Sequence, residues 1–259
     1  MTEQIEHVLV RRMGVSSTLH SGGVAEIVLD HPPVNALPAA GWQTLADELR
    51  RAGAEARAVV LRAEGRGFCA GVDIKELQSS GDRQLALLAV NRACAAAFAA
   101  VYECEVPVVA AVHGFCLGGG VGLAGNADML LASSDATFGL PEVDRGALGA
   151  ATHLSRLVPQ QRLRDMVYTC QPATAGELHG YGSVLAVVPR AELRDAAMAI
   201  AERIAAKEPA VVRAAKQSLN DIDPMDVKRS YRFEQGFTFE LDLQGAGDRA
   251  RSAFLTKKS

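Results

Sequence analysis

Three consecutive glycines, Gly118, Gly119 and Gly120, follow an apolar run from Val106 to Val112 and precede a segment of small residues. This order predicts a strand, a tight turn and the start of a helix. Glycine lets the backbone approach a ligand closely, and the first amides of a helix have no partner within it. The turn could therefore present N–H groups to an anion or a developing oxyanion. The glycines could equally serve only to let the helix pack closely against the strand.

A second stretch, upstream, repeats this order of elements. A buried strand is expected at Ala58–Leu61, followed by a turn that contains Gly65, Gly67 and Gly71, and Asp73 is expected to cap a helix. Two such units could direct two backbone amides at one oxygen, which suits the stabilisation of an enolate or a tetrahedral oxyanion. The triple-glycine turn lacks the lysine and the spacing of a nucleotide phosphate loop.

Ionisable side chains accompany both stretches. Glu142 lies where a helix is expected to begin, so it could act as a base or could merely be favoured there by the helix dipole. Asp144 is a second candidate, and Arg145 could simply pair with it. His113 and His153 could relay a proton, although a histidine in a packed turn is more often a satisfied structural group.

The rest of the chain predicts the frame that positions these residues. Strands and helices alternate in the first part, which favours an α/β layer, and from residue 190 onward the pattern becomes helical. The expected strands are Val24–Leu29, Ala58–Leu61, Val106–Val112 and Ser183–Val188, and the expected helices are Pro38–Gly53, Arg83–Tyr102, Ala150–Val158, Gln161–Tyr168, Pro209–Leu219 and Asp226–Leu243.

Composition limits the class of protein. The chain has 259 residues, of which 49% are hydrophobic, and this is enough for one large domain with a sizeable core. A net charge of -3 gives no electrostatic footprint for nucleic acid. The five cysteines are odd in number and lack CxxC spacing, so we expect reduced thiols, no metal site and a cytoplasmic location. No signal peptide and no membrane-spanning run are indicated.

The C-terminal part is rich in aromatic residues. The segment Tyr231–Leu241 reads YRFEQGFTFEL in a chain that has few aromatic residues. An interface helix explains this better than an active-site lid does. We therefore expect oligomerisation through this region, and no membrane partner.

Three motifs resemble the crotonase, or enoyl-CoA hydratase/isomerase, superfamily. They are FCAGVDIKEL at Phe68–Leu77, AAVHGFCLGGGVGLAGNADMLLAS at Ala110–Ser133 and ATFGLPEVDRGALG at Ala136–Gly149. The resemblance implies an α/β spiral of ββα units over residues 1–189 that holds an acyl-CoA site. It also implies a helical oligomerisation region over residues 190–259, and homotrimers or hexamers.

The resemblance also implies roles for individual residues. The two oxyanion amides fall on Val72 and Gly119, and Glu142 is the expected base. No cofactor is implied besides the CoA thioester that is the substrate. Lys257 and Lys258 could meet CoA phosphates or form an ordinary solvated tail. Contacts to CoA are expected from Val34, Ala36, Ala70, Asp73, Ile74 and Lys75.

One departure from the family pattern concerns the chemistry. Hydratases of this family use two glutamates to hold and activate a water; one aligns with Glu142, but the other position holds Gly122. Simple hydration is therefore in doubt, whereas an isomerase could shuttle a proton on one carboxylate.

Longer runs resemble the branch of the family that hydrolyses a carbon–carbon bond of a cyclic diketone in steroid degradation. They include RAEGRGFCAGVDIKE and SYRFEQGFTFEL. This branch implies that water opens a five-membered ring while the thioester oxygen carries enolate charge. The alternatives are an isomerase or hydratase acting on linear enoyl-CoA, and a non-catalytic binder of CoA esters.

Overall fold

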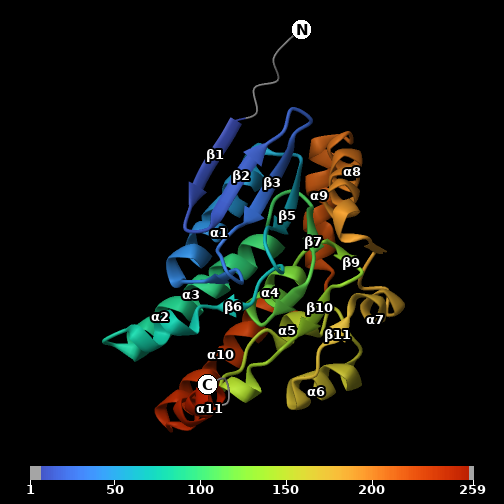
Figure 1. Cartoon of the computed structure of the whole chain (residues 1–259). Coiled ribbons are helices and arrows are strands. Elements are labelled where there is room, and N and C mark those ends of the chain that lie inside the picture. Colours follow the sequence, from blue (N-terminus) through green and yellow to red (C-terminus); the bar gives the residue numbers. More distant parts are fainter. Residues whose placement is uncertain (1–6, 257–259) are drawn as a thin grey trace.

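A computed structural model describes residues 7–256 of the chain (Figure 1). Its largest sheet has seven strands in the order β1-β2-β3-β5-β7-β9-β12, of which β1 to β3 are antiparallel and the rest run parallel to β3. The strands are β1 His7–Arg12, β2 Val15–Leu19, β3 Val24–Leu29, β5 Ala58–Ala63, β7 Val108–Val112, β9 Met129–Ser133 and β12 Ala186–Val188.

Four of these strands each begin a strand–strand–helix unit. After β3 come β4 (Ala36–Leu37) and α1 (Ala39–Glu55), and after β5 come β6 (Gly71–Val72), α2 (Ile74–Ser79) and α3 (Arg83–Tyr102). The other two units place β8 (Phe115–Leu117) and α4 (Gly119–Ala124) after β7, and β10 (Thr137–Gly139), η1 (Val143–Arg145) and α5 (Ala151–Leu154) after β9. The second strands pair among themselves, β4 with β6 and β8 with β10, and β11 (Ala173–Thr174) adds to β10. The expected α/β class and spiral of ββα units are confirmed.

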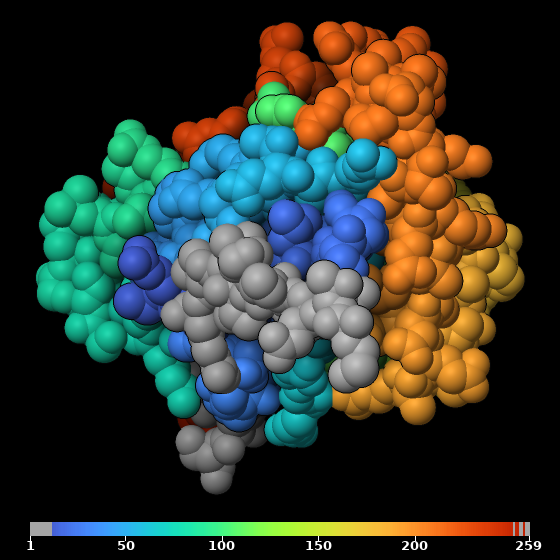
Figure 2. Space-filling view, turned by 90° about the horizontal axis from the view of Figure 1, so that it is seen from above, coloured from blue at the N-terminus to red at the C-terminus, as the bar shows by residue number. Residues whose placement is uncertain are grey.

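Alternate residues of the large sheet enter two separate cores. In β5, Val59 and Leu61 pack in the core that contains α1 and α3, whereas Ala58 and Val60 face α8 (Leu193–Ala205). Side chains along a strand point to opposite faces in turn, so a continuous apolar run covers both faces. In Figure 1 these helices lie on opposite sides of the sheet, and in Figure 2 the orange surface of α8 borders the blue N-terminal part.

Helices dominate the remainder of the chain. They are α6 Gln160–Thr169, α7 Ala175–Gly180, η2 Arg190–Glu192, α9 Pro209–Asp221, α10 Val227–Leu243 and α11 Ala246–Thr256. α10 packs against α3 and α5, while α8 covers the sheet directly. Among the described residues, α3 is the one helix long and apolar enough to cross a membrane, and it packs against α1. A boundary at residue 190 stays a prediction.

Several elements differ from the sequence-based expectation. The helix expected at Ala150–Val158 is one turn, α5, and the residues after it form tighter turns in which Leu157 N–H donates to the Leu154 carbonyl. The strand expected at Ser183–Val188 begins only at Ala186. The antiparallel strands β1 and β2 were not predicted, because polar residues such as Ser16 and Thr18 mask their pattern.

A buried carboxylate connects α8 to the sheet. Glu26 of β3 accepts hydrogen bonds from Arg194 Nε and Nη2 at 2.7 and 2.8 Å, and it also contacts Arg62 Nε and His20 Nε2. Burial alone would raise the pKa of Glu26, but the bonds from Arg194 and Arg62 outweigh it and lower the pKa to about 2. Ionised Glu26 is therefore more stable in the folded protein than in the unfolded chain, and its ionisation stabilises the fold.

We predict that Glu26→Gln lowers the free energy of unfolding at pH 7 by about 3 kcal/mol, because the shift from 4.5 to about 2 is stabilisation held by the ionised group. This contribution is complete above pH 4.5 and is lost as the pH falls toward 2. Urea titrations at several pH values measure it. Wild type and variant should converge at low pH, and equal stability at pH 7 would contradict the assignment.

Candidate active site

The two glycine-rich turns lie against each other. Leu117 N–H donates to the Cys69 carbonyl at 2.8 Å, which joins β8 to the turn before β6. A Cβ on Gly71 would lie 3.1 Å from the Gly119 backbone nitrogen, and one on Gly119 would lie 2.7 Å from the Trp42 ring. Glycine is required at Gly118 as well, since φ is +55° there. Small residues thus let the two turns meet.

Val72 and Gly119, predicted to supply the oxyanion amides, line one cavity together with Glu142. Its volume is about 110 Å³. Gly119 is the first residue of α4, so its N–H has no partner inside the helix. One face of α3 supplies much of the remaining wall, with Leu87, Val90, Asn91, Cys94 and Phe98. The cavity is therefore largely apolar, and Glu142 is the one carboxylate among its lining residues.

The carboxyl group of Glu142 is buried at this cavity. Its Oε1 lies against Gly118, where a Cβ would approach to 2.3 Å, and its Oε2 has no hydrogen-bond partner among the described residues. Burial raises the pKa of Glu142 to about 8, and the nearby charge of Arg145 offsets only part of this effect. A carboxyl group with such a pKa can both take and return a proton near neutral pH.

The two weaker catalytic candidates lie elsewhere. Asp144 is exposed on η1 and is not part of the cavity wall. His113 is buried, its Nε2 donates to the Gly65 carbonyl at 3.2 Å, and it lines a separate hollow with Arg62 and Arg190. Burial and the charge of Arg190 lower the pKa of His113. The structure therefore does not bring His113 to the cavity of Glu142.

His153 sits behind the cavity wall. Its Nδ1 lies 3.1 Å from Asn126 Oδ1, and its ring packs edge-on against Phe98 with 5.0 Å between centroids. Burial lowers the pKa of His153 to about 3, so the ring is neutral. Tyr231 of α10 packs against both rings and lines the cavity itself.

The residues expected to hold CoA lie on two paired segments. β4 pairs with β6, Ala70 N–H donates to the Val34 carbonyl at 3.1 Å, and Asp73 Oδ1 accepts from Lys75 N–H as the cap of α2. The expected cap is confirmed. Of the six residues, Ala70 and Ile74 line the cavity, whereas Val34, Ala36, Asp73 and Lys75 lie outside its wall. Lys257 and Lys258 lie outside the described residues.

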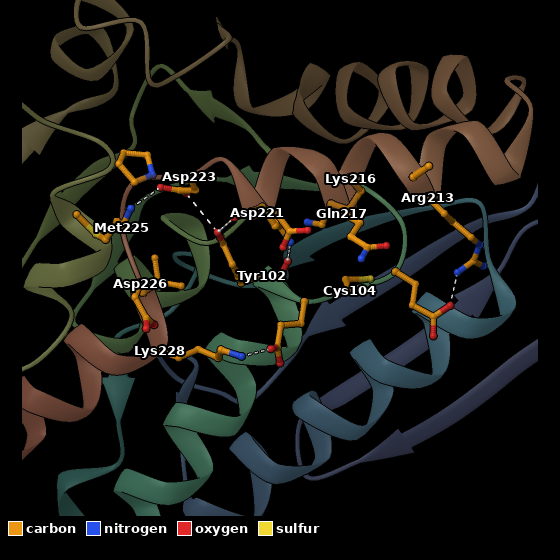
Figure 3. A pocket seen from close by; sticks show the side chains of 16 residues that line it. Tyr102, Cys104, Arg213, Lys216, Gln217, Asp221, Asp223, Met225, Asp226 and Lys228 are labelled. Atoms are coloured by element: carbon orange, nitrogen blue, oxygen red, sulfur yellow. Dashed lines mark hydrogen bonds and ion pairs between the residues drawn. The ribbon is translucent and has the colours of Figure 1, made fainter.

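A larger and more open hollow of about 860 Å³ separates the end of α3 from α9 and the start of α10 (Figure 3). Ion pairs between Arg213 and Glu105 and between Lys228 and Glu103 lie along it. Tyr102 Oη donates to the Asn220 carbonyl at 3.1 Å. The wall of this hollow includes none of the residues predicted for catalysis or CoA binding.

Comparison with known proteins identifies the family. The model for enoyl-CoA hydratase/isomerase matches residues 20–255, nearly the whole chain. The chain belongs to the enoyl-CoA hydratase/isomerase family. A solved member, the enoyl-CoA hydratase/isomerase from Xanthobacter autotrophicus Py2, is 27% identical with a TM-score of 0.84, and the match covers 94% of this chain and 92% of that chain.

Two curated relatives are much more similar to this chain in sequence. Both are named (7aS)-7a-methyl-1,5-dioxo-2,3,5,6,7,7a-hexahydro-1H-indene-carboxyl-CoA hydrolase. The protein from Rhodococcus jostii (strain RHA1) is 59% identical over 245 residues, which cover 94% of this chain and 95% of that protein. The protein from Mycobacterium tuberculosis (strain ATCC 25618 / H37Rv) is 57% identical over 247 residues, which cover 95% of this chain and all of that protein.

Within this family the structure explains the departure at Gly122. A Cβ there would lie 2.3 Å from the tip of the Phe98 ring, so the ring fills the space that a side chain at this position would need. Trp42 packs edge-on against the same ring at 5.6 Å between centroids. At the position where the resemblance to hydratases leads us to expect a second glutamate, Gly122 packs directly against an aromatic ring.

Sequence reasoning missed some members of the cavity wall. Asn91, Phe98 and Thr238 were not singled out for function, and Arg145 was considered only as a partner of Asp144. One signal was available, because Asn91 is a polar residue on the helix face that also carries Leu87, Val90, Cys94 and Phe98. Glu234 does not line the cavity; it accepts hydrogen bonds from Ala151 N–H at 3.1 Å and Thr152 Oγ1 at 2.6 Å.

We predict that Gly122→Ala lowers the free energy of unfolding by about 1–3 kcal/mol, because the new Cβ overlaps Phe98. In the double variant Gly122→Ala and Phe98→Leu, the loss of unfolding free energy should be smaller than the sum of the losses in the two single variants. The smaller leucine side chain makes room for the new Cβ. Gly180→Ala on α7, where the added Cβ meets nothing within 4 Å, is the matched control. Thermal and urea unfolding measure these effects, and equal stability of Gly122→Ala and the control would refute the overlap.

Proposed function

We propose that this protein opens the five-membered ring of a methylated bicyclic dione that is carried as a CoA thioester. The observation that carries this proposal is the single buried carboxylate, Glu142, in an apolar cavity where Phe98 fills the place of a second one. The names of the 59% and 57% identical relatives support it, because they describe hydrolases of such a thioester. As in the sequence-based expectation, we place the reaction in steroid degradation.

The name of those relatives gives the positions of the oxo groups and of the double bond in the ring system of their substrate. The 1-oxo group lies in the five-membered ring, beside the ring-fusion carbon 7a that carries the methyl group. The hexahydro description leaves the other fusion carbon, 3a, doubly bonded to carbon 4, next to the 5-oxo group. An electron pair released at carbon 7a is therefore conjugated with the 5-oxo group. Cleavage between carbons 1 and 7a is a vinylogous retro-Claisen reaction.

In the proposed mechanism, Glu142 takes a proton from water while the water oxygen bonds to the 1-oxo carbon. The tetrahedral intermediate collapses, the bond to carbon 7a breaks, and the 1-oxo carbon becomes a carboxylic acid. Glu142 then returns its proton to the conjugated carbanion. A pKa of about 8 suits both steps, because the group is a stronger base than an ordinary carboxylate and still ionises near neutral pH.

The backbone amides of Val72 and Gly119 stabilise the enolate charge that reaches the thioester oxygen. Such preorganised donors contribute about 3 kcal/mol each in other oxyanion holes. Backbone amides do not titrate, so this stabilisation persists over the pH range in which Glu142 changes its protonation state. The segments around Val34–Ala36 and Ala70–Lys75 would hold the CoA moiety.

The reaction consumes water and leaves the thioester intact, so it needs no metal or redox cofactor. We place the protein in the cytoplasm and propose that residues 190–259 form a homotrimer or hexamer. The exposed face of α10 supports assembly, because Phe233 and Phe237 are 70% and 42% exposed and stack edge-on with 5.2 Å between centroids. Tyr231, by contrast, faces the core.

A double-bond isomerase is the second candidate, since one buried carboxyl with a raised pKa can shuttle a proton between carbons of an enoyl-CoA. A non-catalytic binder of CoA esters is the alternative of another class. Incubation with the bicyclic dione thioester and, separately, with linear enoyl-CoA esters distinguishes all three. Ring opening gives a new carboxylic acid with no free thiol, isomerisation gives a product of unchanged mass, and a binder gives no product.

We predict that Glu142→Gln lowers kcat for ring opening by about 10²- to 10⁴-fold, the usual contribution of a general base. In wild type, kcat/KM should rise with pH through about 8, since the base must be ionised. The residual rate of Glu142→Gln should not show this rise with pH. Initial rates between pH 6 and 9.5 measure both effects.

Asp144→Asn, two residues away and exposed, is the control for Glu142→Gln. A loss in Asp144→Asn as large as that in Glu142→Gln would move the base to Asp144. An unchanged rate in Glu142→Gln would rule out the proposed mechanism.

We predict that the double change Phe233→Ser and Phe237→Ser lowers the mass of the assembly toward that of a monomer, because it removes the exposed aromatic pair. Light scattering after size-exclusion chromatography measures the mass. Tyr168→Ser on α6, an equally exposed aromatic residue, is the control and should leave the mass unchanged. A monomeric wild type, or an unchanged mass of the double variant, would contradict the proposed interface.

A further inference from the structure

One polar side chain interrupts the apolar face that α3 presents to the cavity. Asn91 lies among Leu87, Val90, Cys94 and Phe98, and all five line the cavity. Their spacing of three, four and seven residues places them on one side of the helix. An apolar ring system would pack well against such a face, and Asn91 is the residue on it that can form a strong hydrogen bond.

The Nδ2 group of Asn91 is a buried donor on this face of α3. It makes no hydrogen bond among the described residues. The backbone carbonyl of Asn91 is held by Gln235 Nε2 of α10 at 2.8 Å, which fixes this part of α3. A buried donor without an acceptor lowers stability, so its presence on an otherwise apolar face points to an acceptor supplied by a ligand.

Two other uncharged side chains with a hydroxyl group lie on the cavity wall, Thr238 and Tyr231. Thr238 Oγ1 donates to the Leu148 carbonyl at 2.8 Å and accepts from Leu148 N–H at 3.0 Å. Burial raises the pKa of the Tyr231 phenol overall, although Gln235 lies beside it and the Gln235 side chain lowers this pKa and so acts on the phenol as a donor. Among these uncharged wall residues, Asn91 Nδ2 is the polar side-chain atom that is buried without a hydrogen-bond partner in the described part of the chain, so it is available to a substrate oxygen.

The proposed reaction has an oxygen that still needs a donor. The thioester oxygen faces the backbone amides of Val72 and Gly119, and the 1-oxo carbon is attacked by the water that Glu142 activates. The electron pair released from the broken bond also reaches the 5-oxo oxygen through the double bond of the six-membered ring. None of Val72, Gly119 and Glu142 is assigned to stabilise negative charge at the 5-oxo oxygen.

We propose that Asn91 Nδ2 donates a hydrogen bond to the 5-oxo oxygen of the six-membered ring, and that this bond strengthens as the oxygen gains enolate charge. The inference rests on the proposed ring-opening function. It makes Asn91 a third oxyanion donor and a determinant of specificity. Linear enoyl-CoA esters carry no such oxygen and would leave the buried amide without an acceptor.

The first test is Asn91→Leu, which keeps the approximate size and removes the donor. We expect kcat for ring opening to fall about 100-fold, as for loss of one oxyanion-hole donor. The thermal unfolding midpoint should stay the same or rise, because the variant no longer buries an unsatisfied amide. Gln84→Leu, the matching change at an exposed position of α3 outside the cavity wall, is the control.

The second test needs no turnover. An analogue of the thioester that lacks the 1-oxo group and carries ¹³C at the 5-oxo carbon binds without reacting, and infrared difference spectroscopy reads its carbonyl stretch. Wild type and Gln84→Leu should lower this frequency relative to water, and Asn91→Leu should remove that shift. The thioester carbonyl shift should persist in all three proteins.

These outcomes separate the two proposals. Ring opening by wild type, with an unchanged rate and an unchanged 5-oxo band in Asn91→Leu, overturns the role of Asn91. If wild type does not open the dione ring at all, the proposed function is wrong, and the infrared band still decides whether Asn91 contacts the ring oxygen. A lower unfolding midpoint together with an unchanged band would make Asn91 a purely structural residue.

Discussion

The site depends on the burial of one carboxyl group, that of Glu142, whose Oε2 has no hydrogen-bond partner in the part of the chain that the structure describes. Desolvation of this group opposes ionisation and raises its pKa to about 8. The surrounding structure keeps it buried, since Gly118 has no side chain to displace Oε1 and Phe98 closes the space beside Gly122. A second carboxylate in that space would change both the charge and the shape of the cavity. Burial thus determines the basicity of Glu142, and the packing of Phe98 leaves no room for a side chain at Gly122.

The frame contributes by bringing distant turns together. The turn before β6 and the turn after β8 lie against each other, with Gly71 close to the Gly119 nitrogen, although nearly fifty residues separate Val72 from Gly119. Close contact between these turns requires glycine at Gly71 and Gly119. The sheet is fixed from both faces, by α1 and α3 on one side and by α8 on the other. Rigid elements therefore support backbone donors whose positions matter for the proposed chemistry.

Much of this arrangement could be predicted from the sequence, because glycine spacing and apolar runs are local signals. The strand at Val24–Leu29, the helix at Arg83–Tyr102 and the cap at Asp73 agree with the structure. What the sequence did not reveal depends on tertiary contacts. The sequence places the polar Asn91 on an apolar helix face, but only the structure shows that its Nδ2 is buried without a partner among the described residues. His113 and Glu142 line different cavities, which depends on how the fold places their turns. The assignments of Val72, Gly119 and the CoA-binding residues stay predictions.

The most direct test of the central claim is the fate of the water oxygen. The bicyclic dione thioester is incubated with wild-type protein in ¹⁸O-labelled water, and the product is analysed by mass spectrometry with fragmentation. The account predicts one ¹⁸O atom in the new carboxylic acid, an intact CoA thioester and no labelled alcohol. Label in an alcohol would show hydration instead, and label in a carboxylate with release of free CoA would show thioester hydrolysis. Either result would contradict ring opening by Glu142.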